Sequence, residues 1–220
     1  MRAALDVAAR PAARPAARPV ARLAAVALAA LSAGCFSVSL TRPPPRDLYA
    51  LDAVPSPPAP VAGRPAVLVA DTRAVPGLDG RDIVYVERPH QVRHYARSAW
   101  VDTPARMLAP LLVQALEGGG FRALRDGEPP AGLRLETEIV RLRQEFLARP
   151  SRVRFALRVR LVGADGVLVD REIEAEEEAP SDDAYGGVVA ANRAVSAVLE
   201  EAVSICTEAS ARAGTAPPGR

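Results

Sequence analysis

The sequence predicts an α/β (α+β) fold: a single domain in which a mainly antiparallel or mixed sheet is backed by two helices. Apolar and polar residues alternate through residues 133–176, which is typical of half-buried strands. Apolar residues recur every three or four positions at about 103–117 and 182–206, which is typical of helices that cover a sheet. Only 4% of the residues are aromatic, so we expect a core of Val, Leu, Ile and Ala.

Shorter apolar segments extend the predicted sheet on the N-terminal side. Turn-forming residues bound each of them, and the runs themselves are rich in Val, Ile, Leu and Tyr. We therefore expect strands at 48–51, 67–70, 83–86, 92–95 and 121–124.

Both predicted helices have recognisable ends. Thr103, followed by a proline, has the sequence of an N-cap, and the glycines 118–120 end the first helix. Ser181 is predicted to cap the second helix, with Asp182 and Asp183 in its first turn, where negative charge is favourable.

The longest strand pattern changes phase near residues 139–140. A β-bulge inserts one extra residue and moves the following side chains to the other face. The apolar or core-facing series before the change is Leu133, Leu135, Thr137 and Ile139, and the series after it is Val140, Leu142, Gln144 and Phe146.

The hairpin around Asp165 can be derived from parity. A two-residue loop would place Val159 opposite Glu172 and mix the apolar and charged faces. A three-residue loop, Ala164-Asp165-Gly166, pairs residues whose numbers sum to 330. It also places a glycine at the left-handed position that such loops require. We predict this register.

The predicted register brings arginines and carboxylates together on the solvent face of the hairpin. The expected pairs are Arg160 with Asp170, Arg158 with Glu172, Arg154 with Glu176 and Arg152 with Glu178. Each cross-strand pair contributes about 0.2–1 kcal/mol. We interpret these charges as a structural ladder, and a site for acidic lipid headgroups is the alternative.

Residues 1–34 have the composition of a lipoprotein signal peptide. Five arginines and one aspartate accompany an apolar run at 23–31, and Leu31-Ser32-Ala33-Gly34-Cys35 has the pattern of a lipobox. We predict that Cys35 is the lipid attachment site and carries acyl chains such as palmitate. The alternative is an uncleaved membrane helix, but the uncharged residues 23–40 barely reach the length of about 17–25 residues that spans a bilayer.

Both interpretations place the domain outside the cytoplasm, because the arginines of the leader stay inside. Phe36 follows the cysteine, whereas aspartate at this position retains lipoproteins at the inner membrane of Gram-negative cells. We therefore predict a lipid anchor in the outer membrane, facing the periplasm. The formal net charge of the chain is +2, and that of residues 1–34 is +4, so the remaining residues together carry −2. No nucleic-acid partner is expected from that charge.

The chain divides into four parts. We expect a signal peptide at 1–34, a lipidated cysteine with a proline-rich tether at 35–65, a globular domain at 66–206 and a disordered tail at 207–220. The short strand at 48–51 falls within the tether. Extended polyproline rises about 3.1 Å per residue, so the fourteen residues from the anchor to Tyr49 could hold the domain up to about 40 Å from the lipid.

Residue types that support catalysis are scarce. The chain has no lysine, which excludes a P-loop lysine and a Schiff base. His90 and His94 could share a strand face, but no third metal ligand is apparent near them. Cys206 falls on the apolar stripe of the second helix and is expected to be buried and inert. We expect no enzymatic activity, cofactor or metal.

Several segments together carry a resemblance to a known family. They are the lipobox, Tyr49-Ala50-Leu51, the stretch from Leu78 to Tyr85, the strand ending at His94-Tyr95, and Trp100 followed by Pro104 and a leucine-rich helix. From about Tyr49 to Cys206 the chain resembles the ABC-type transport auxiliary lipoproteins, which include the third component of the paraquat-inducible system. The resemblance implies a sheet backed by two helices and no catalytic residues.

The resemblance also implies a role beside mammalian-cell-entry-type proteins, which move lipids between the two membranes and so support membrane integrity. We expect a non-enzymatic outer-membrane accessory subunit of such an ABC transport system, which docks a mammalian-cell-entry-type periplasmic protein and assembles as a homo-oligomer. Tyr85, Tyr95 and Trp100 are candidate contact residues, with core packing as the alternative for each. The alternative function is a periplasmic lipid-binding or chaperone-like lipoprotein that itself holds an acyl chain.

Overall fold

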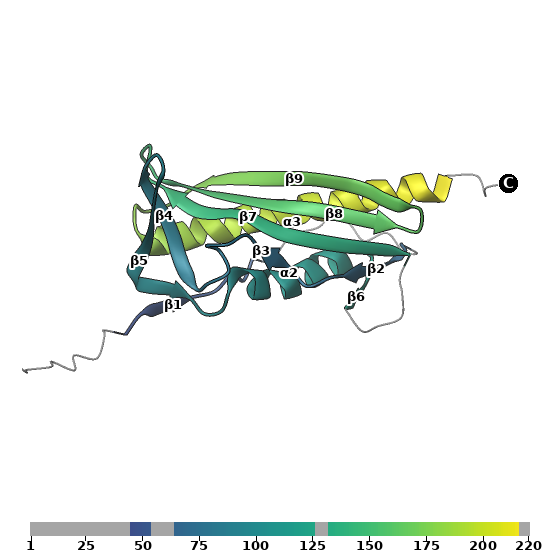
Figure 1. The fold of residues 1–220 in the computed structure, drawn as a ribbon, viewed down its shortest axis with the longest axis horizontal. Coiled ribbons are helices and arrows are strands. Elements are labelled where there is room, and N and C mark those ends of the chain that lie inside the picture. The colour runs from purple at the N-terminus through teal and green to yellow at the C-terminus, as the bar shows by residue number, and fades with distance from the viewer. Residues whose placement is uncertain (1–44, 54–63, 126–131, 216–220) are drawn as a thin grey trace, which may run out of the picture. The chain divides into compact units, whose positions relative to one another are not determined.

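The computed structural model describes residues 45–53, 64–125 and 132–215. They form a mixed, open sheet of nine strands and two helices, as the sequence predicts (Figure 1). In chain order, the elements are β1 (Asp47–Tyr49), β2 (Ala66–Val69), β3 (Arg73–Ala74), β4 (Asp82–Arg88), β5 (Gln91–Trp100), α2 (Pro104–Gly118), β6 (Arg122–Arg125), β7 (Leu133–Glu145), β8 (Arg152–Gly163), β9 (Gly166–Glu178) and α3 (Ala184–Thr215).

Strand β7 is the axis of the sheet. One edge of β7 pairs antiparallel with β8 over almost its whole length, and β8 pairs in turn with β9. The other edge pairs in parallel with three short strands in succession, β2, β3 and β4. Outside these, β6 lies beside β2, and β5 lies beside β4 with β1 beyond it. The topology is therefore one long meander joined to a set of short parallel strands.

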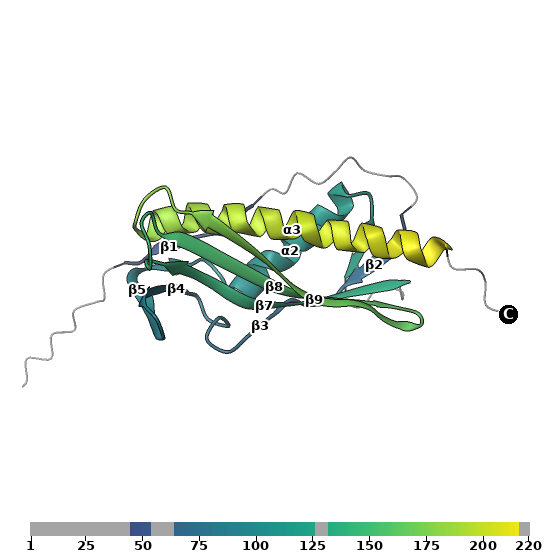
Figure 2. The same ribbon diagram turned by 90° about the horizontal axis from the view of Figure 1, so that it is seen from above.

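Both helices cover the apolar face of this sheet. Helix α3 lies along β8 and β9, and α2 packs against β2, β3 and β6 and against α3 (Figure 2). The alternate residues of β8 that face α3, such as Phe155, Leu157 and Val159, are completely buried. They join the buried residues of both helices in one apolar cluster, in which Trp100 is the only tryptophan.

The predicted bulge and hairpin register are confirmed, but the turn differs. The register of β7 on β8 shifts between Ile139 and Arg141, where the change of phase places a bulge. Strands β8 and β9 pair with numbers summing to 330 from Arg152↔Glu178 to Leu161↔Val169. The loop contains two residues, not three, because the pairs next to it are Val162↔Val167 and Gly163↔Gly166.

The extra residue is Leu168, which the strand absorbs as a second bulge beside the turn. To keep the apolar and charged faces in phase, the hairpin needs one additional residue on the β9 side. A bulge in β9 can supply this residue, just as a longer loop would. Gly166 adopts a positive φ of 122°, so glycine is needed at the predicted position.

The N-cap of the second helix is Asp183, and the prediction of Ser181 is wrong. Helix α3 begins at Ala184, and the Gly186 amide donates a hydrogen bond of 2.7 Å to Asp183 Oδ1. The Ser181 hydroxyl donates to the same oxygen at 2.8 Å and so supports the cap. These bonds, the Gly186 amide first, lower the pKa of Asp183 below its ordinary value. At α2, Thr103 is the N-cap residue as predicted, although its side chain makes no capping bond.

Two predicted boundaries are corrected. The first strand pairs with β5 of the sheet, and Leu51 and Ala53 after it are buried, so the folded domain includes part of the predicted tether. Helix α3 continues to Thr215, although a tail was expected from residue 207. The apolar stripe extends one turn beyond Cys206 to Ala209, which is buried, and this packing continues the helix.

Replacement of the capping residue tests this assignment. We expect Asp183→Ala to lower the free energy of unfolding by about 1 kcal/mol at pH 7, because the Gly186 amide loses its acceptor. The pKa of the Asp183 carboxyl is lower in the folded than in the unfolded protein. Its contribution to the free energy of unfolding is therefore complete above the unfolded pKa of 3.8 and is lost as the pH falls towards the folded pKa. Urea unfolding should give a difference that is full at pH 6 and much smaller at pH 3; a constant difference would contradict it. Asp183→Asn, which keeps an acceptor, is the control.

Candidate functional site

The predicted lipid attachment site, Cys35, lies outside the described residues, as do the lipobox and the signal peptide. Within the described part of the chain, neither α2 nor α3 combines the length and the apolar composition that crossing a membrane requires.

An aromatic cluster forms where β4, β5 and the end of β7 meet. The rings of Tyr85 and Tyr95 lie 4.6 Å apart, and Phe146 contacts Tyr85 edge to face at 5.9 Å, distances at which aromatic pairs attract one another. All three side chains are partly exposed. The structure thus brings together two of the three predicted contact residues and adds Phe146. Trp100 is only 3% exposed and packs in the core, so it is not available to a partner.

A buried polar network holds the aromatic cluster in place. The Tyr95 hydroxyl donates to Gln144 Oε1 at 2.9 Å, and Gln144 Nε2 donates to the Ser151 hydroxyl at 2.9 Å. The Ser151 amide in turn donates to Asp182 Oδ1 at 2.8 Å, just before α3. Strands β5 and β7, the start of β8 and the entry to α3 are therefore tied together by one chain of hydrogen bonds.

The network fixes the charge state of its members as well as their positions. Burial raises the pKa of Tyr95, and the neighbouring Tyr85 raises it further, so the hydroxyl remains a donor. The Ser151 amide lowers the pKa of Asp182 and keeps it an acceptor. The side chain of Gln144 fits here only because the neighbouring residue of α3 is a glycine. A Cβ on Gly187 would lie 2.1 Å from Gln144 Oε1. The sequence pattern gave no sign of this contact.

One exposed aliphatic side chain follows the aromatic cluster in the sequence. It is not Val92: that residue is 58% exposed but pairs with Val86 in the β4–β5 hairpin, so it lies on the face opposite to Tyr85 and Tyr95. The Val86 carbonyl accepts a hydrogen bond from the Phe146 amide, and Leu147 follows with 53% of its surface exposed. Apolar side chains exposed on a rigid frame are typical of protein contact sites.

The charge ladder extends over three strands, one more than predicted. On β8, Arg152 pairs with Glu176 and Glu178 at 2.8 Å. Arg154 lies between Glu176 at 2.8 Å and Glu145 of β7 at 3.4 Å. Arg152, Arg154, Glu176 and Glu178 are in the predicted register, whereas Glu145 was not among the predicted partners.

Two ladder pairs differ from those expected. Arg158 reaches diagonally to Asp170 at 2.9 Å instead of Glu172, and the bond lowers the pKa of Asp170. Arg160 reaches Glu136 of β7 at 3.5 Å. Every arginine of β8 thus has a carboxylate partner, so this strand offers no excess positive charge to an acidic headgroup. The structure favours the structural interpretation of the ladder.

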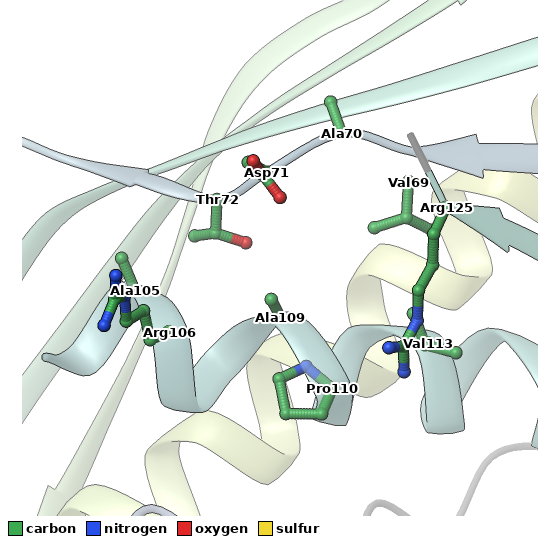
Figure 3. A pocket seen from close by; sticks show the side chains of 10 residues that line it. All are labelled: Val69, Ala70, Asp71, Thr72, Ala105, Arg106, Ala109, Pro110, Val113 and Arg125. Atoms are coloured by element: carbon green, nitrogen blue, oxygen red, sulfur yellow. The ribbon is translucent and has the colours of Figure 1, made fainter. Parts of the chain in front are cut away.

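A cleft of about 490 Å³ separates α2 from the chain that follows β2 (Figure 3). On one side are Ala105, Ala109 and Pro110 of α2, and on the other are Ala70, Asp71 and Thr72. The side chains of Arg106 and Arg125 lie towards the two ends (Figure 3). Sequence reasoning did not find this cleft; its only local signal is the pair of small residues four positions apart, followed by a proline inside a helix.

Cys206, His90 and His94 lie in separate parts of the described fold. Cys206 is buried as predicted, and burial raises the pKa of its thiol to about 12. His90 lies in the β4–β5 turn with a positive φ of 65°, and His94 is exposed on β5. Among the described residues, no three His, Cys, Asp or Glu side chains are grouped as metal ligands would be.

Comparison with known families decides the assignment. Residues 49–203 match the family described as ABC-type transport auxiliary lipoprotein component. The chain belongs to this family. The resemblance found in the sequence is therefore confirmed, and it covers the sheet, the aromatic cluster, the cleft and both helices up to Val203 of α3.

Solved structures share the fold of this auxiliary lipoprotein. Protein XCC0632 from Xanthomonas campestris is similar with a TM-score of 0.68 at 19% identity, over 77% of this chain and 99% of that one. A second structure, of an uncharacterized protein, is similar with a TM-score of 0.58 at 16% identity, over 74% and 98% of the two chains. At these identities the likeness concerns the fold alone. No curated protein sequence matches the chain significantly.

Adding a methyl group at Gly187 tests whether the polar network is locked. Alanine raises helix propensity by about 1 kcal/mol, but it would displace Gln144, which is buried and bonded on both sides. Leaving buried polar groups unpaired costs about 1–3 kcal/mol each. We expect Gly187→Ala to destabilise the domain by about 1–3 kcal/mol in urea unfolding.

The control is Gly80→Ala, since a Cβ there meets no atom within 4 Å. We expect it to change stability by less than about 0.5 kcal/mol. A Gly187→Ala protein as stable as the wild type would mean that Gln144 moves freely, and the network would then not hold the aromatic cluster.

Proposed function

We propose that this protein is a non-enzymatic accessory subunit of an ABC-type system that moves lipids between the two membranes of the cell envelope. Lipid on Cys35 would anchor it in the outer membrane, facing the periplasm, where it docks a mammalian-cell-entry-type protein of that system. The family match over residues 49–203 carries this proposal. The lipobox-like sequence before Cys35 supports the anchor, because several acyl chains hold a protein stably at a membrane.

The construction of the domain supports a docking role in preference to catalysis. The buried polar groups of the Gln144 network serve to connect β5, β7 and α3, and its members are paired with one another. The thiol of Cys206 is buried with a raised pKa, so it is neither accessible nor ionised near neutral pH. What the fold holds rigidly at its surface is the aromatic cluster.

The aromatic cluster of Tyr85, Tyr95 and Phe146, together with the adjacent Leu147, forms the docking surface in this proposal. Tyrosine and phenylalanine bring a large contact area with little conformational freedom to lose. The hydrogen bond from Tyr95 to Gln144 leaves the ring even less freedom before binding, so ordering it costs less on association.

The anchor is tested by metabolic labelling. Radiolabelled palmitate should enter the wild-type protein and not Cys35→Ala, since the thiol is the attachment atom. Equal labelling would remove the lipoprotein assignment. In fractionated envelopes, we expect the labelled protein in the outer membrane, because Phe36 is not a retention signal. Recovery in the inner membrane would overturn that localisation.

The docking surface is tested by a matched pair of substitutions. Leu147→Arg and Val167→Arg each place a charge at an aliphatic side chain that is about half exposed, at 53% and 49%. Only Leu147 is at the aromatic cluster; Val167 is beside the β8–β9 turn. We expect Leu147→Arg to weaken binding to the mammalian-cell-entry-type protein at least tenfold, about 1.4 kcal/mol, with no change for Val167→Arg.

Binding of purified proteins can be followed by surface plasmon resonance. Equal binding by both variants would move the docking surface elsewhere. Failure of the wild-type protein to bind, together with acyl lipid that co-purifies with it in stoichiometric amount, would favour the lipid-holding alternative.

A further inference from the structure

The sheet has a notch beside β3. Three strands follow one another along the far edge of β7, and the first and third have outer neighbours, since β6 pairs with β2 and β5 pairs with β4. Strand β3 lies between them and pairs only with β7. Among the described residues, no strand therefore occupies its outer edge.

Backbone groups point into this notch. In a parallel ladder, successive residues direct their N–H and C=O groups to opposite sides. The Ala70 amide bonds to the Leu135 carbonyl, and the Val75 amide bonds to the Ile139 carbonyl, both on β7. Within the β3 ladder, Ala74 precedes Val75 and consequently turns its own N–H and C=O groups outward. The described part of the chain forms no hydrogen bond to the Ala74 backbone.

Helix α2 leaves room for a further strand at this edge. Its side towards the notch carries the small side chains of Ala105 and Ala109 and the ring of Pro110 (Figure 3). Pro110 has no N–H, so the carbonyl of Arg106, four residues earlier, lacks its usual helical donor. The resulting cleft of about 490 Å³ is within the range of 300–1,000 Å³ that is typical of ligand sites.

The charges around the notch favour an acidic occupant. Arg106 is 78% exposed, and its closest carboxylate, Asp102, is 3.9 Å away, a weak exposed pair. A second arginine, Arg125, lines the far end of the cleft, and the carboxylate of Asp71 stands against these two. Arg73 of β3 does not line the cleft; its side chain is on the face of the charge ladder, with Glu136, Glu138 and Asp170.

We propose that the notch, defined as residues 70–74 with the facing side chains Ala105, Arg106, Ala109 and Pro110, binds an extended acidic peptide segment of the periplasmic partner by strand addition. The inference rests on the proposed function, because it names a second place where that partner binds. The peptide backbone pairs with Ala74, its small side chains face Ala105 and Ala109 of α2, and its carboxylates lie at the two ends of the cleft, towards Arg106 and Arg125. Main-chain pairing of this kind supplies affinity, and the side-chain contacts supply selectivity.

The test uses the folded lipoprotein domain and overlapping twelve-residue peptides that cover the periplasmic part of the mammalian-cell-entry-type protein. Ala109→Phe fills the cleft from α2, and Gln114→Phe is the matched control, an exposed residue on the same helix that does not line the cleft. By fluorescence anisotropy, we expect an acidic peptide to bind the wild type and Gln114→Phe within twofold of each other. We expect Ala109→Phe to lose at least tenfold in affinity, and Arg106→Glu at least fivefold.

A second measurement reports the binding mode. Strand addition should slow hydrogen exchange of the Ala74 amide in the peptide complex, whereas a surface-bound peptide or a bound acyl chain would leave it unchanged. Circular dichroism and thermal unfolding establish that each variant is folded. Peptide binding that Ala109→Phe does not weaken, or binding without protection of this amide, overturns the proposal.

The outcomes separate this inference from the proposed function. If the intact partner binds through the aromatic cluster but no peptide binds, strand addition is wrong and the accessory role stands. The same conclusion follows if phospholipid vesicles or a second copy of the chain bind at the notch instead of a peptide. If the intact partner does not bind the wild-type protein at all, both proposals fail.

Discussion

Pairing along both edges of β7 is the constraint on which the rest of the structure depends. A thirteen-residue strand is long enough to hold β8 on one side and three separate short strands on the other. Because each of these short strands has few ladder bonds of its own, its position follows from the register of β7. The bulge after Ile139 matters for the same reason. It determines which side chains of β7 face the helices before the bulge and which do so after it.

The hairpin of β8 and β9 converts this register into stability. Its apolar face is buried under α3, and its opposite face carries arginines and carboxylates in alternating strands. Each exposed ion pair contributes little, but a slip of one residue would bury charges and expose Phe155 and Leu157 together. The ladder therefore acts mainly on the choice of register, and its pairing of every β8 arginine leaves this strand no excess positive charge.

The two surfaces proposed to meet a partner differ in how the fold prepares them. The aromatic cluster is held from below by Gln144, whose position depends on the absence of a side chain at Gly187. The notch at β3 is instead formed because no described strand pairs with the outer edge of β3 and because the facing residues of α2 are small. Both surfaces are fixed before binding, which limits the entropy lost on association.

By itself, the sequence determined the fold class, both helices, the bulge near Ile139 and the register of the last hairpin, because each is encoded by local periodicity and parity. It also identified the family and the burial of Cys206, which followed from its place on a helix stripe. Only the tertiary structure decided that Trp100 is buried, that Phe146 joins Tyr85 and Tyr95, and that β3 has no outer neighbour among the described strands. These features depend on which distant segments pair with β7, and periodicity within one segment carries no information about its neighbours in space.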